Sequence, residues 1–259
     1  MYKYVRGDTV LKIENLTKAY GEKRAVDNLS LHIKAGEMYA FIGHNGAGKT
    51  TTLKACTGLL NFDEGQIFID GVSIKENPLE CKRKFAYIPD NPDLYEFMSG
   101  IKYLNFVSDV YGVSTKERNE KIKKYGDMFG LTEDLAQPIS AYSHGMKQKL
   151  AIISALVHSP SLLIMDEPFV GLDPRAAFLL KEEMKAICEN GGAIFFSTHV
   201  LDVAEKICDK IAIIKDGKLV VCGDMGEVKG DNSLESIFLE LEDKESTFGK
   251  DWSNAENSN

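Results

Sequence analysis

The stretch GHNGAGKTT, from Gly43 to Thr51, places three glycines around one lysine and follows the lysine with two threonines. The spacing Gly-x-x-x-x-Gly-Lys-Thr is that of a phosphate-binding loop. Glycines let successive backbone N–H groups point at phosphate oxygens, and the positive end of a following helix adds to the attraction. A flexible turn is the alternative. The stretch follows a predicted strand and opens a predicted helix, so we expect a phosphate site.

Two polar residues of this loop have specific expected roles. Lys49 is expected to reach the β and γ phosphates of a nucleotide, and the Thr50 hydroxyl to bind Mg²⁺. Both roles follow from the chemistry of an ammonium beside anions and of a hard cation beside oxygen. The whole loop is expected to contact the nucleotide, that is Gly43, His44, Asn45, Gly46, Ala47, Gly48, Lys49, Thr50 and Thr51.

A phosphate loop of this kind also needs an acid for the metal. The segment LLIMDE supplies four apolar residues followed by Asp166 and Glu167. We expect Asp166 to hold Mg²⁺, directly or through water. We expect Glu167 to act as the general base that polarises the attacking water. A strand that ends in an acidic turn is common, and it is the alternative for this segment taken alone.

The order of the expected elements indicates an α/β fold. Met38–Ile42 is a continuous apolar run, as in a buried parallel strand, and Asn28–Ile33 alternates. A helix is expected at 49–56, and Asp173-Pro174 should start another. We therefore predict a P-loop NTPase core with a mainly parallel sheet, an N-terminal antiparallel β region and a helical insertion subdomain. Further strands are expected at Gln66–Gly71, Leu162–Asp166, Ala193–Thr198 and, as a hairpin, Ile211–Gly223.

The helical insertion should occupy about 91–159, where the apolar period becomes helical. Segments around 101–110, 115–128 and 143–157 fit this pattern. We predict one domain over 1–241, with its core at 1–90 and 160–241 and a helical arm between them. Residues 242–259 are expected to form a polar, acidic tail. Trp252 is the one residue that could anchor this tail.

Composition excludes several functions. The net charge is −8, which argues against a nucleic-acid partner because such proteins usually carry a basic excess. No apolar run approaches the roughly 20 residues of a membrane-spanning helix. The first residues contain no apolar segment typical of a signal peptide. The five cysteines form no Cys-x-x-Cys pair, so reduced and mostly buried thiols in the cytosol are expected.

The segment YSHGMKQK, Tyr142–Lys149, resembles the signature sequence of the ATP-binding subunits of ABC transporters, usually Leu-Ser-Gly-Gly-Gln. Ser143 and Gly145 match that signature, whereas Tyr142, His144 and Met146 depart from it. Variants of this kind resemble those of exporters whose permeases are separate chains (ABC-2-type exporters). Independently of the family, Ser143 is a good N-cap for a helix that presents free N–H groups to an anion, although an ordinary capped helix would look the same.

The resemblance implies further residues. Tyr20 is similar to the aromatic residue that stacks on adenine, and His199 to the switch histidine that contacts the γ-phosphate. Gly171–Asp173 resembles the loop that links two active sites across a dimer, and it can cap a helix as well. The family then implies two ATP molecules and Mg²⁺ between two subunits, a homodimer or a pair of paralogues. Each site would take its phosphate loop from one subunit and Ser143, Gly145 and Met146 from the other.

The family also implies a transmembrane permease subunit as partner. This chain would then be cytoplasmic and peripheral, held at the membrane through the permease, and its activity would be ATP hydrolysis that drives transport. The signature variant favours export over import. A soluble ABC ATPase that acts on the ribosome or DNA is the alternative, and a P-loop switch or kinase outside the family is a third.

Asp90 is where the chain leaves the family pattern. ABC proteins usually place a glutamine after a Tyr-x-Pro sequence, and here AYIPDNPDLY offers Asp90. An acid beside polyphosphate is repelled unless Mg²⁺ lies between them. Either Asp90 faces the metal and belongs to the nucleotide site, or this loop senses nucleotide less directly. A turn-forming aspartate between two prolines is the simplest alternative.

Overall fold

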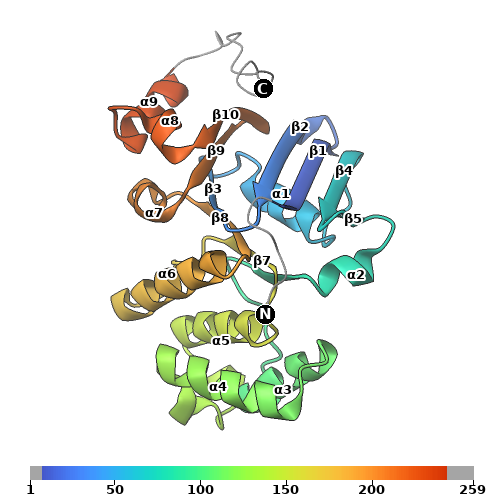
Figure 1. The fold of residues 1–259 in the computed structure, drawn as a ribbon, viewed down its shortest axis with the longest axis vertical. Coiled ribbons are helices and arrows are strands. Elements are labelled where there is room, and N and C mark those ends of the chain that lie inside the picture. Colours follow the sequence, from blue (N-terminus) through green and yellow to red (C-terminus); the bar gives the residue numbers. More distant parts are fainter. Residues whose placement is uncertain (1–7, 244–259) are drawn as a thin grey trace.

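The computed structural model describes residues 8–243 of the chain and has an α/β architecture built on two sheets (Figure 1). The larger sheet has the order β10-β9-β3-β8-β7-β6. All of its neighbouring strands are parallel except β10 and β9. Its strands are β3 (Met38–Ile42), β6 (Phe85–Ile88), β7 (Leu162–Asp166), β8 (Ala193–Thr198), β9 (Lys210–Lys215) and β10 (Lys218–Asp224).

The second sheet is antiparallel and comes from the N-terminal part of the chain. Its order is β2-β1-β4-β5. The alternation predicted at 28–33 is confirmed, since Leu29, Leu31 and Ile33 are buried. The strand is longer than expected because its polar start pairs with the end of β1, up to Tyr20 opposite Lys23. The strands are β1 (Thr9–Tyr20), β2 (Lys23–Lys34), β4 (Glu64–Ile69) and β5 (Val72–Ser73).

The two faces of the larger sheet are buried in different apolar clusters. Along β3, Met38 and Ile42 face one cluster, which includes α5 (His144–Val157) and α6 (Pro174–Glu189). Phe41, between them, faces the other cluster, which includes the antiparallel sheet and α1 (Lys49–Cys56). A parallel strand covered on both faces needs apolar residues at every position. This explains the unbroken run at 38–42.

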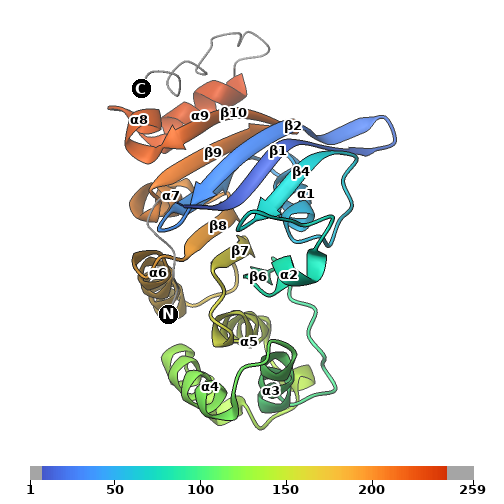
Figure 2. The same ribbon diagram turned by 45° about the vertical axis from the view of Figure 1, so that its right-hand side comes forward.

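The helical arm lies at one end of the molecule (Figures 1 and 2). It comprises α3 (Gly100–Val110), α4 (Thr115–Phe129), two short 3₁₀ turns (Thr132–Asp134 and Ile139–Ala141) and α5. In both views α5 lies between the sheet and the other two helices. The remaining helices are α2 (Pro78–Lys82), α7 (Leu201–Ile207), α8 (Met225–Lys229) and α9 (Leu234–Asp243).

Several local predictions are confirmed. Asp173 caps α6 by accepting a hydrogen bond from the Ala176 N–H at 2.8 Å. Asp216 and Gly217 have φ of 49° and 79°, the left-handed values that a tight β9–β10 hairpin needs. The five cysteines, all within the described residues, form no disulfide, and Cys222 is the exposed one. Trp252 and most of the expected tail, 244–259, lie outside the described residues.

Candidate nucleotide site

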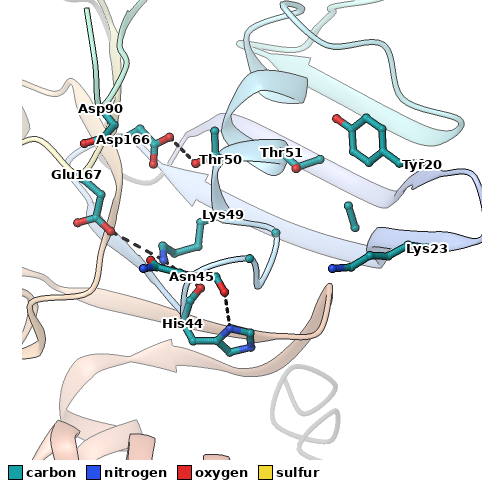
Figure 3. Close-up of a pocket in the computed structure, with 13 residues that line it drawn as sticks. Tyr20, Lys23, His44, Asn45, Lys49, Thr50, Thr51, Asp90, Asp166 and Glu167 are labelled. Atoms are coloured by element: carbon teal, nitrogen blue, oxygen red, sulfur yellow. Dashed lines mark hydrogen bonds and ion pairs between the residues drawn. The ribbon is translucent and has the colours of Figure 1, made fainter.

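The site is assembled at the carboxyl edge of the larger sheet. The phosphate loop follows β3, and Asp90 follows β6. Asp166 is the last residue of β7 with Glu167 directly after it, and His199 follows β8. Parallel strands end at the same edge, so residues far apart in sequence meet there. A pocket of about 290 Å³ lies at this edge (Figure 3). It is lined by Tyr20, Lys23, Ala25, His44, Asn45, Gly46, Gly48, Lys49, Thr50, Thr51, Asp90, Asp166 and Glu167.

The glycines of the loop have a packing role as well as an open backbone. A Cβ on Gly48, whose φ is 113°, would stand 2.4 Å from the Ala25 carbonyl oxygen. A Cβ on Gly43 would stand 2.5 Å from the Ile214 carbonyl oxygen. The loop therefore lies directly against both sheets. Gly43 and Ala47, both expected at the nucleotide, do not line the pocket, and the Ala47 side chain is fully buried.

Lys49 is held inside the curve of the loop. Its ammonium donates hydrogen bonds to the carbonyl oxygens of Gly43 at 2.6 Å and His44 at 3.3 Å. It also lies 3.8 Å from Glu167 Oε1. Burial lowers the pKa of Lys49, and the carboxylates of Glu167 and Asp166 oppose that effect. A cation so placed is ready to exchange its carbonyl partners for phosphate oxygens.

Asp166 is fixed from two sides. The Thr50 hydroxyl donates to Asp166 Oδ2 at 2.6 Å, and the Ser197 hydroxyl donates to Oδ1 at 2.5 Å. Asp166 and Ser197 are direct neighbours in the β7–β8 register. Ser197 is a site residue that was not predicted from the sequence. Its position at the end of the strand before His199 is the signal that could have indicated it.

The residues around Asp166 fit a magnesium ion. The described residues contain no group of three or more His, Cys, Asp or Glu that could hold a metal by themselves. Mg²⁺ usually takes only one or two protein ligands, together with phosphates and water, and the hydroxyl of Thr50 and the carboxylate of Asp166 are such oxygen donors. The nearby Tyr87 hydroxyl is buried without a partner among the described residues, and burial together with Asp166 and Asp90 raises its pKa. A water held by an ion would satisfy this hydroxyl.

Glu167 has φ of 48°, an unusual value for a residue with a side chain. Its N–H donates to the carbonyl and hydroxyl oxygens of Ser197, at 3.2 and 3.1 Å. Its carboxylate accepts from the His199 N–H at 3.3 Å and lies 2.9 Å from His199 Nδ1. His199 does not line the pocket, but Glu167 connects it to the pocket wall.

Tyr20 stands at the far end of the pocket from Asp166, at the end of β1 (Figure 3). Its side chain is 54% exposed. The Lys18 ammonium lies 5.3 Å from the ring centroid and is held by Asp63 at 3.2 Å. Tyr20 lines the pocket and Lys18 does not, so the exposed ring is accessible to a flat base in the pocket.

Asp90 lines the pocket near Asp166 and is exposed. It lies between β6 and the start of the arm, at the carboxyl edge of the sheet. The structure thus places Asp90, which stands where the family usually has a glutamine, in the same pocket lining as the phosphate loop.

The signature residues lie elsewhere. Ser143, Gly145 and Met146 do not line the pocket. Ser143 caps α5, accepting from the Met146 N–H at 3.3 Å. A Cβ on Gly145 would stand 2.8 Å from the Gly171 carbonyl oxygen, so the start of α5 packs against the 171–173 loop. Lys149 pairs with Asp173 at 2.6 Å across the same contact.

Comparison with known proteins identifies the family. The sequence profile described as "ABC transporter" matches residues 26–170, which include the phosphate loop, the signature and the acidic pair. The chain belongs to the ABC transporter family. It is an ATP-binding subunit with ATPase activity, and its α/β P-loop fold is confirmed.

Individual relatives support the same family assignment. It is 38% identical to the uncharacterized ABC transporter ATP-binding protein YhcH of Bacillus subtilis, over 90% of this chain and 76% of the relative. It is 36% identical to the linearmycin resistance ATP-binding protein LnrL of the same organism, over 83% and 69%. A solved ATP-binding subunit of an ABC transporter superposes with a TM-score of 0.87 at 34% identity, covering 90% of this chain and 99% of that one. In the described part of this chain, no helix is both long and apolar enough to cross a membrane.

Proposed function

We propose that this ABC subunit hydrolyses ATP at the pocket described above and drives a separate permease. Tyr20 stacks on the adenine, the loop N–H groups and Lys49 hold the phosphates, and Thr50 and Asp166 hold Mg²⁺. The metal, when bound, supplies positive charge that stabilises the transferring phosphoryl group. Glu167 takes the proton of the attacking water, and His199 orients Glu167 and contacts the γ-phosphate. Support comes from the carboxyl edge of the larger sheet, where the phosphate loop, Asp166, Glu167 and His199 meet, and from Tyr20 of the antiparallel sheet, which lines the same pocket.

A second copy of the chain, or a paralogue, completes each site. Support comes from the position of the signature: Ser143, Gly145 and Met146 are absent from the pocket of their own chain. The α5 N-terminus carries a partial positive charge that suits a γ-phosphate. Two chains arranged head to tail bring that terminus to the partner's nucleotide. Binding then closes the dimer, and hydrolysis opens it.

The direction of transport is export, and the partner is a membrane protein encoded as a separate chain. Support comes from the signature variant and from LnrL, a relative whose name assigns it to linearmycin resistance. The chain therefore works on the cytoplasmic face of the membrane, where the arm passes the closing motion to the permease. Action on a ribosome or DNA is the rival, and the net charge of −8 disfavours it.

Glu167→Gln tests the proposal. We expect ATP binding to persist while turnover falls about 10²- to 10⁴-fold, the usual loss for a general base. Light scattering with ATP and Mg²⁺ should reveal a trapped dimer. Ser143→Arg placed on the Glu167→Gln background should abolish that dimer, because it blocks the α5 N-terminus. Normal hydrolysis by Glu167→Gln would remove Glu167 from the mechanism, and a dimer indifferent to Ser143→Arg would contradict the sandwich.

The partner is tested separately. Purification of the tagged chain from detergent-solubilised cells should recover a polytopic membrane protein. Recovery of ribosomes or DNA in its place would favour the rival function.

A further inference from the structure

Two lysines line the nucleotide pocket, and only one of them belongs to the phosphate loop. Lys49 sits within the loop, whereas Lys23 opens β2 at the opposite end, beside Tyr20 (Figure 3). The three carboxylates that line the pocket, Asp90, Asp166 and Glu167, lie toward the other end in the same view. Lys23 belongs neither to the phosphate loop nor to the signature.

The β-ladder fixes Lys23 on the same side as the tyrosine ring. Tyr20 and Lys23 are directly paired residues of β1 and β2, across the turn that contains Gly21. Side chains of directly paired antiparallel residues share one face of the sheet, with Cβ atoms about 4.5–5.5 Å apart. In Figure 3 the Lys23 amino group points from the Tyr20 end toward the phosphate loop.

The neighbouring cations are already engaged, and Lys23 is not. Lys18 pairs with Asp63 at 3.2 Å, and Arg24 pairs with Asp27 at 2.6 Å. Lys218, on the adjacent hairpin, also reaches Asp27 at 3.5 Å. Over residues 8–243, no carboxylate lies within ion-pair distance of the Lys23 ammonium. Lys23 thus brings an uncompensated positive charge to the pocket.

We infer that Lys23 binds the α-phosphate of the nucleotide, an inference that rests on the proposed ATP site. With the base on Tyr20 and the terminal phosphates at Lys49, the ribose and the α-phosphate span the gap between them. Of these two groups the α-phosphate is the anion, and an ammonium favours it over a neutral sugar. ATP and ADP both carry an α-phosphate, so Lys23 contributes equally to both and does not distinguish them.

Lys23→Met tests this role, with Lys34→Met as the matched control. Lys34 is an exposed lysine at the other end of the same strand and does not line the pocket. Titration calorimetry at low salt should show ATP and ADP affinities reduced about 3- to 10-fold by the same factor in Lys23→Met. Adenosine affinity should be unchanged. Lys23→Arg should retain wild-type affinity, the loss should shrink in high salt, and Lys34→Met should bind as wild type does.

The outcomes separate this inference from the proposed function. If wild-type protein binds no ATP, or Lys49→Ala binds as well as wild type, the nucleotide site itself is wrong. If wild type binds and Lys49→Ala does not, but Lys23→Met equals wild type, only the inference is overturned. A loss confined to ATP would place Lys23 at the γ-phosphate and also overturn it. A loss of adenosine affinity would assign Lys23 to the base and would likewise contradict it.

Discussion

Glu167 shows how single residues of this site are held in place against their own preferences. A left-handed backbone costs a non-glycine residue about 1–2 kcal/mol. Three contacts with the end of β8 and the residue just after it hold it there: two hydrogen bonds to Ser197 and one from the His199 N–H. The backbone turn directs the carboxylate toward Lys49, 3.8 Å away. The strain is thus offset by contacts that also orient the proposed general base.

Asp90 carries a prediction at the same scale. Because Tyr20 and the phosphate loop are proposed to supply the grip on the nucleotide, Asp90→Ala should change ATP affinity only a few-fold, within about 1 kcal/mol. It should raise the Mg²⁺ concentration needed for half-maximal turnover, since Asp90 is proposed to face the metal or its water shell. It should also reduce turnover of the permease complex more than that of the isolated subunit.

The measurement is ATPase rate across a Mg²⁺ titration, with and without the permease. Asp93→Ala, in the same loop but outside the pocket lining, is the control. Identical Mg²⁺ dependence and coupled turnover in Asp90→Ala and wild type would reduce Asp90 to a turn residue.

At the scale of an element, the start of α5 depends on a close approach to the 171–173 loop. Ser143 caps the helix, Gly145 lies against the Gly171 carbonyl, and Lys149 pairs with Asp173. The signature glycine therefore has a reason to be glycine within its own chain, before any partner is present. Because of these contacts, we expect the 171–173 loop, which is proposed to link the two active sites, and the signature helix to move as one unit.

Gly145→Ala should disrupt the contact between the start of α5 and the 171–173 loop. Its new methyl group would stand 2.8 Å from the Gly171 oxygen, so the helix or the loop must shift. We expect a loss of about 1–3 kcal/mol in unfolding free energy, the usual cost of overpacking, and weaker ATP-induced dimerisation. Gly226→Ala is the matched control, because Gly226 is also the second residue of a helix and has open space around its Cβ position. Urea denaturation and light scattering provide the readouts, and equal stability of the two variants would contradict the packing argument.

At the scale of the whole molecule, His158 joins the arm to the sheet. Its ring stacks on Tyr111 at the end of α3, with centroids 3.7 Å apart, and its Nε2 lies 3.4 Å from the Phe85 carbonyl oxygen of β6. Burial lowers the pKa of His158 to about 4, and the charge of Lys121 acts in the same direction. The His158 ring therefore stays neutral in the folded protein at pH values above about 4.

The pH dependence follows from that lowered pKa. An unfolded histidine takes up its proton near pH 6.5, whereas the folded one resists until about pH 4. Folding stability from this group is thus fully present above pH 6.5 and is lost progressively as the pH falls toward 4. We expect a loss of about 1–3 kcal/mol by pH 4.5. Urea midpoints followed by circular dichroism from pH 7.5 to 4.5 measure it, and His158→Gln should show a shallower acid-side slope. Parallel slopes would exclude His158 as the cause.

Much of this protein follows from its sequence alone. The glycine spacing at 43–48 favours a phosphate loop, and the short apolar run at 162–165 favours a buried strand that presents Asp166 at its end. The order of apolar runs and helical periods determines the α/β class, because buried parallel strands and amphipathic helices have different periods. Local capping chemistry likewise indicates the starts of α5 and α6.

Other features depend on which strands become neighbours. Ser197 contacts Asp166 because β8 lies beside β7, and Lys23 faces Tyr20 because β1 and β2 pair without a shift at their turn. Gly48 and Gly145 must be glycine because carbonyl groups from distant segments pack against them. The same packing places the signature outside its own pocket. Such contacts arise between residues far apart in the chain, whose approach is set by burial of both faces of the sheet, and no local pattern encodes them.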